Sequence, residues 1–227
     1  MKINKPFILY FILFLSTLLY QIFVAISPVI TFGVKEKIMI VTLGILWLSL
    51  SVWQLLKELK ERSQKRKLMT AFISLVFVIY LVNLIYVLFF DGDFGRSITV
   101  QNNKLLSNMV EGINLEPFKM MKDYMLAYQN GHIYLSHLLL NVVGNLIVFA
   151  PMGILLPTLS DTMDSFFRFP LFMATTIILS ECAQVYFSVG VGDIDDFILN
   201  FTGVMIVFLI YKIPFVKKAW KHLLYRD

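Results

Sequence analysis

Long apolar runs separated by short polar segments dominate this chain. Six runs have about the length that a helix needs to cross a membrane, roughly 17–25 residues. They cover residues 6–30, 38–56, 68–90, 132–156, 169–189 and 197–213. The runs are continuous, whereas the strands of a membrane barrel would alternate with a period of two. Because lipid offers the backbone no hydrogen-bond partner, the pattern predicts an all-α polytopic transmembrane helical bundle of about six spans.

The composition supports this class and changes how the charge is interpreted. Hydrophobic residues make up 58% of the 227 residues and the mean hydropathy is +0.76, whereas an average soluble domain is roughly 45–50% apolar. The net charge of +5 comes from basic residues between the spans, so it indicates orientation in the membrane. We therefore expect the lipid bilayer as the surroundings and no nucleic-acid partner.

The basic residues are distributed unevenly between the two sides. An even number of spans places both termini on one side, and that side holds fourteen of the 20 Lys and Arg residues. Positive charge is enriched in cytoplasmic connections. We therefore predict that the N- and C-termini are cytoplasmic. The long segment 91–131 and the turn 190–196 are then external.

Two basic segments lie on the predicted cytoplasmic side. The first is the loop at the end of residues 1–67, after the second span. Residues 214–227 form a basic amphipathic cytoplasmic tail, whose mixture of apolar residues and lysines is typical of a helix along a membrane surface.

Polar side chains interrupt the last three spans, and they are the candidate ligand-binding residues. A carboxylate near mid-membrane costs about 2.5–3.5 kcal/mol on insertion scales, so such residues usually face the interior of a bundle. In the fourth span the candidates recur every four residues and share one helix face. The candidates in the spans and the turn are His137, Asn141, Asn145, Glu181, Gln184, Asp193, Asp195, Asp196 and Asn200.

A structural interpretation competes with this one. Aspartates at a helix start accept hydrogen bonds from unpaired backbone N–H groups, so we expect one or two of the aspartates at 193–196 to act only as caps. Asparagines in a bundle often join neighbouring helices. Capping does not account for Glu181 or for Asn200, one turn deeper. The predicted topology places these groups at similar depth, which favours a polar cavity open to the outside.

The external segment adds Arg96 and Asn114 to the candidate site. An arginine there either pairs with the carboxylates or binds an anionic head group, and both possibilities stay open. A divalent cation is a further candidate cofactor, because magnesium and calcium prefer oxygen ligands. Its candidate ligands are Glu181, Asp193 and Asp196.

Four pieces of the sequence resemble the VanZ-like family in order and spacing. They are NLEPFK at 114–119, NVVGNLIVFAPMGILLP at 141–157, SECAQ at 180–184 and GDIDDFILN at 192–200, followed by Gly203. The resemblance covers about 68–213, so it implies that these residues are the VanZ-like membrane domain and that residues 1–67 are an N-terminal two-span extension. It implies a bacterial cytoplasmic-membrane protein of the cell envelope, associated with lowered susceptibility to glycopeptide antibiotics such as teicoplanin.

Several functions remain open at this point. The outward pocket engages a cell-wall lipid precursor or a lipophilic glycopeptide, or the chain is a metal-dependent membrane enzyme acting on a lipid-linked phosphate or ester. No HExxH spacing supports the enzyme. A small transporter is a third hypothesis, although no inverted repeat is visible. A scaffold that binds another wall-synthesis protein through segment 91–131 is the structural alternative.

Overall fold

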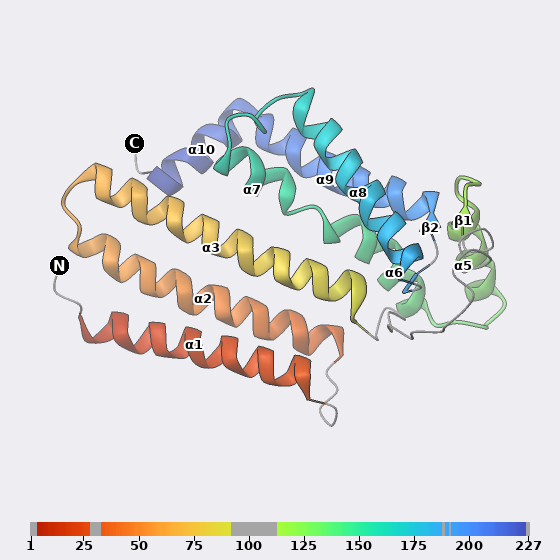
Figure 1. Ribbon diagram of the computed structural model, residues 1–227, viewed down its shortest axis with the longest axis horizontal. Helices are drawn as coiled ribbons and strands as arrows, with labels where there is room; N and C mark the ends of the chain where they lie inside the picture. Colours follow the sequence, from red (N-terminus) through yellow and green to blue (C-terminus); the bar gives the residue numbers. More distant parts are fainter. Residues whose placement is uncertain (1–3, 28–32, 92–112, 188, 191, 226–227) are drawn as a thin grey trace. The chain divides into compact units, whose positions relative to one another are not determined.

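The computed structural model describes residues 4–27, 33–91, 113–187, 189–190 and 192–225. Six helical segments in these ranges are long and apolar enough to cross a membrane, which confirms the predicted all-α bundle (Figure 1). The elements are α1 (Lys5–Ile26), α2 (Val34–Glu58), α3 (Arg62–Phe89), β1 (Ile113–Asn114), α5 (Lys119–Gln129), α6 (Leu135–Val148), α7 (Met152–Leu159), α8 (Arg168–Tyr186), β2 (Gly192–Asp193), α9 (Ile194–Lys212) and α10 (Pro214–Tyr225).

The chain divides into two compact units, Met1–Val78 with Ala219–Asp227, and Ile79–Lys218. In the first unit α1 and α2 form an antiparallel pair (Figure 1). The amide of Asn4, which caps α1, lies 3.5 Å from Glu58 at the end of α2. The rings of Tyr10 and Trp47 stack between the two helices. The candidate residues that the structure describes all belong to the second unit.

The third span begins earlier than the hydrophobic pattern predicts. We expected it from residue 68, but α3 already starts at Arg62. The added turn consists mainly of Arg, Gln and Lys, which are good helix formers. The helix therefore extends beyond the apolar run into the basic segment.

The fourth span consists of two helices, α6 and α7, which are separated at Pro151. Proline lacks the backbone N–H that would continue the helix, which accounts for a break at this residue. The N–H of Met152, which would bond the carbonyl of Val148 in a continuous α-helix, donates to the carbonyl of Phe149 instead at 3.0 Å. The hydroxyl of Tyr80 in α3 donates a hydrogen bond to the carbonyl of Val148 at 2.8 Å. The third span thus stabilises the interruption in the fourth.

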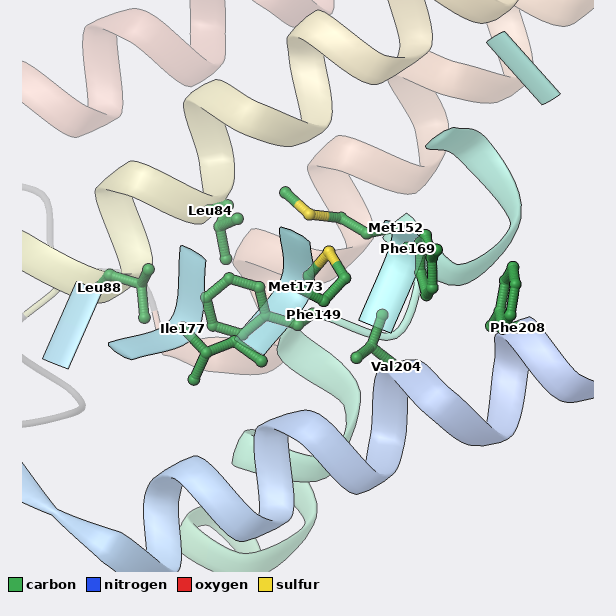
Figure 2. Close-up of a cluster of buried hydrophobic side chains, with 9 residues drawn as sticks. All are labelled: Leu84, Leu88, Phe149, Met152, Phe169, Met173, Ile177, Val204 and Phe208. Atoms are coloured by element: carbon green, nitrogen blue, oxygen red, sulfur yellow. The ribbon is translucent and has the colours of Figure 1, made fainter. Parts of the chain in front are cut away.

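The core of the second unit lies between the end of α3 and helices α7, α8 and α9. Figure 2 shows its side chains converging from these elements. Phe169 of α8 and Phe208 of α9 stack with their ring centroids 4.1 Å apart. The buried cluster contains Leu84, Leu88, Phe149, Met152, Phe169, Met173, Ile177, Val204 and Phe208.

Two glycines allow α9 to approach its neighbours at backbone distance. A Cβ atom built on Gly203 would lie 1.6 Å from the carbonyl oxygen of Leu146 in α6. One built on Gly153 of α7 would lie 2.7 Å from backbone atoms of Val204 and Phe208. No side chain fits at such distances, so these glycines set the spacing of α9 from α6 and α7. The polar face of α6 is thereby held against α9.

Candidate functional site

The candidate site begins where the segment after α8 turns into α9. Asp193 is the N-cap of α9, and its Oδ1 accepts a hydrogen bond from the N–H of Asp195 at 2.9 Å. Its Oδ2 accepts one from the amide of Asn114 at 3.0 Å. Strands β1 and β2, which carry these two residues, pair in parallel. The predicted capping role is confirmed for Asp193, and Asn114 is its structural partner.

Asp195 caps a different helix from the one that contains it. Its side chain is 0% exposed, and its carboxylate accepts hydrogen bonds from the backbone N–H groups of Phe118 and Met121, the latter at 3.1 Å. Phe118 is the N-cap residue of α5 and Met121 lies in its first turn, and no side chain of the N-cap residue itself caps this helix. Phe118 has a φ of 64°, a left-handed conformation that is costly for a bulky residue. Asp195 therefore fixes the start of α5.

Asp196 connects α9 to α6. The amide of Asn145 donates a hydrogen bond to Oδ1 of Asp196, which is buried. Asn145 directly precedes Leu146, whose carbonyl faces Gly203. The structure thus brings together two candidates from different spans, and the contact between α6 and α9 depends on a small residue as well as on a polar pair.

Three buried amide oxygens lie within the same three spans. Gln184 of α8 is 1% exposed, and its amide nitrogen donates to the carbonyl of Leu88 near the end of α3 at 2.9 Å. Asn200 of α9 is 2% exposed. Among the described residues, Oε1 of Gln184 and Oδ1 of Asn141 and Asn200 have no hydrogen-bond partner. A buried acceptor without a partner costs about 1–3 kcal/mol, so these oxygens can accept hydrogen bonds from a ligand or water.

Glu181 lies three residues before Gln184 on α8. Its Oε2 atom is buried in protein, although the residue as a whole is partly exposed. This oxygen of the carboxylate therefore lies against protein atoms, as is expected of an acidic group within a span.

Two other predicted residues do not join the buried group. His137 is exposed on α6, where its ring lies 6.1 Å from the ring of Tyr134. It shares a helix face with Asn141 by spacing but lies in the first turn of α6. Arg96 falls outside the residues that the structure describes.

The candidate cation ligands do not come together. In the described part of the chain, no group of three or more His, Cys, Asp or Glu side chains could hold a metal ion. Asp193 is bound by Asn114, and Asp196 accepts from Asn145. The set of Glu181, Asp193 and Asp196 proposed from the sequence is therefore not a metal-ligand group in the structure.

The opposite end of α9 carries a charged cluster. Asp164, in the loop between α7 and α8, accepts from Nζ of Lys212 at 2.8 Å and from Nζ of Lys217. Burial raises the pKa of Asp164, but the hydrogen bonds and charges of the two lysines outweigh it, so the pKa lies below its usual value. This cluster ties the loop to the end of α9 and the start of α10.

Comparison with known proteins adds one match. A family model described as VanZ/LLP1 matches residues 77–216. The match begins within α3, contains all the described candidate residues and excludes α1 and α2. No curated protein and no solved structure matches the chain.

Proposed function

We propose a function for this chain, which belongs to the VanZ/LLP1 family: it lowers susceptibility to teicoplanin-type glycopeptides by engaging a cell-wall lipid precursor in a polar pocket between α6, α8 and α9. The protein would act in the bacterial cytoplasmic membrane with both termini inside and the pocket facing outward. The observation that supports this most directly is the set of buried amide oxygens of Asn141, Gln184 and Asn200, which have no partner among the described residues.

The chemistry of the pocket indicates what kind of head group it would bind. Amide oxygens and carboxylates are hydrogen-bond acceptors, so they favour a ligand rich in O–H and N–H donors. The described candidate residues include no lysine or arginine, which would favour a phosphate. Sugar hydroxyls and peptide N–H groups of a cell-wall precursor are donors of the required kind.

The depth of the pocket favours a ligand anchored in the membrane. Asn200 follows Asp196 by four residues, which corresponds to roughly 6 Å along a helix axis. A donor group that reaches Asn200 must therefore pass below the first turn of α9. A ligand whose own lipid chain already lies in the membrane keeps its head group near this depth at a high effective concentration. It therefore loses less entropy on binding than a ligand that arrives from solution.

Susceptibility measurements test the proposal. Cells that lack their own copy would express the wild-type chain, Asn200→Leu or Glu181→Gln at matched membrane abundance, and the inhibitory concentration of teicoplanin would be measured. We expect both variants to lose the protection. Thr175→Leu is the control, because Thr175 is exposed on α8 and its hydroxyl donates to the backbone of its own helix. Full protection by Asn200→Leu and Glu181→Gln would contradict the proposal.

A further inference from the structure

An apolar groove of about 500 Å³ lies between α5 and α6. This volume is within the range of about 300–1,000 Å³ that is typical of ligand sites. None of the polar candidates described above lines the groove. Its walls are formed by Phe118, Met121, Lys122, Met125 and Leu126 of the α5 region and by Leu138, Leu139 and Val142 of α6.

The groove lies at a membrane boundary whichever way the chain is oriented. Its α6 wall belongs to the first two turns of a candidate membrane span that begins at Leu135. Helix α5 ends at Gln129, only a short link before that span. Groove residues such as Leu139 and Met125 are about half exposed. Exposed apolar surface at this level meets the upper part of the lipid acyl chains, which supply an apolar occupant.

One cation stands at the edge of this groove. Lys122 is exposed, and among the described residues the structure records no ion pair for it. Lys119, one turn earlier on α5, lies 3.9 Å from the carboxylate of Glu116. The cation that remains available beside the apolar wall is thus Lys122, and it complements a negatively charged head group.

We propose that the α5–α6 groove binds one acyl chain of an anionic glycerophospholipid, with the phosphate beside Lys122. This lipid site is separate from the polar pocket and does not depend on the function proposed above. Asp195 supports it structurally, since its carboxylate holds the N–H groups of Phe118 and Met121, and both residues line the groove. The acidic start of α9 thereby fixes one wall of a lipid site.

Lipid titration tests this site. The full-length protein in neutral detergent would be titrated with phosphatidylglycerol, and in parallel with phosphatidylcholine, while native mass spectrometry counts bound lipid. We expect phosphatidylglycerol to bind about 2- to 5-fold more tightly, as one exposed ion contact allows. Lys122→Gln should remove this preference, whereas the matched control Lys119→Gln should keep it.

A second pair of variants tests the apolar wall. Leu139→Trp fills the groove and should weaken binding of both lipids about tenfold, which is the effect of about two buried methylene groups. Val143→Trp places the same ring on an exposed part of α6 outside the groove and should leave binding unchanged. Unchanged lipid binding in Leu139→Trp would overturn the proposal. Displacement of phosphatidylglycerol by a lower concentration of polyprenyl phosphate would overturn the assignment to an acyl chain.

Discussion

The start of α9 and the interior one turn deeper contain similar polar side chains but use them differently. At the start, Asp193 and Asp195 accept hydrogen bonds from β1, α5 and the backbone of α9 itself. Deeper in the bundle, Oδ1 of Asn200 and Oε1 of Gln184 have no partner among the described residues. The difference teaches that neighbouring polar residues have separate roles. The aspartates at the start of α9 build the fold, and under the function proposed above the amides behind them would accept hydrogen bonds from a ligand.

The energetics support this division. A capping side chain contributes about 1 kcal/mol, whereas a buried acceptor without a partner costs about 1–3 kcal/mol. If Asn141 and Asn200 served only to join helices, we would expect them to be paired as Asn145 is with Asp196. Acceptors retained at a cost to stability are typical of functional sites.

The largest effect is expected for Gly203→Ala, which should disrupt both the start of α9 and the interior one turn deeper. The added Cβ would lie 1.6 Å from the carbonyl oxygen of Leu146, so α6 and α9 must separate. We expect little folded protein in the membrane, measured by abundance and by size-exclusion chromatography in detergent. Gly44→Ala is the control, because its Cβ would lie 3.7 Å from Thr17. A monodisperse Gly203→Ala protein at normal abundance would contradict the close packing.

Asp195→Ala should affect the contacts at the start of α9 and leave the interior one turn deeper intact. It removes two acceptors from the first turn of α5, and we expect a loss of about 2 kcal/mol in stability. Limited proteolysis should cut the α5 region faster while α9 stays protected. Asp161→Ala, at an exposed position, should show the normal pattern. Equal cleavage of the α5 region in Asp195→Ala and wild type would show that this cap is dispensable.

The sequence could predict the local part of this arrangement and not the long-range part. Continuous apolar runs predicted six spans, and three aspartates before a span predicted a cap, because both signals lie within a few residues. The bond from Phe118 to Asp195 joins residues 77 apart in the chain, and no local pattern indicates it. The local signal near this contact is Asn114, because asparagine side chains often accept from the backbone two residues on, and its Oδ1 accepts from the N–H of Glu116 at 3.2 Å.

Replacement by leucine should change the stability differently at Asn145, which is paired with Asp196, and at Asn200, whose Oδ1 has no partner among the described residues. Asn145→Leu removes the donor to the buried Asp196 carboxylate, so we expect it to destabilise the protein by about 1.5–3 kcal/mol. Asn200→Leu removes an acceptor without a partner among the described residues, so stability should stay equal or rise by about 1 kcal/mol. Thermal unfolding in detergent measures both. Similar losses in the two variants would mean that Asn200 also has a structural role.

The smallest effect concerns acidification and Asp164. Because its pKa is lower in the folded chain than in the unfolded one, its ion pairs stabilise the protein above an aspartate's ordinary pKa of about 3.9. This contribution disappears as the pH falls through the lower, folded value. Asp164→Asn should therefore lower the free energy of unfolding at neutral pH. On acidification, the free energy of unfolding should fall less in this variant than in the wild type. If the stability of the wild type and of Asp164→Asn changed with pH in the same way, the lowered pKa of Asp164 would be contradicted.

Binding of isolated cell-wall lipid precursor to the purified protein tests the polar pocket most directly. The affinities of the wild type, Asn200→Leu and the control Thr175→Leu would be compared in one detergent. If the buried amide oxygen accepts a hydrogen bond from the head group, Asn200→Leu should bind about tenfold more weakly and Thr175→Leu normally. Equal affinity of the wild type and Asn200→Leu would contradict the pocket.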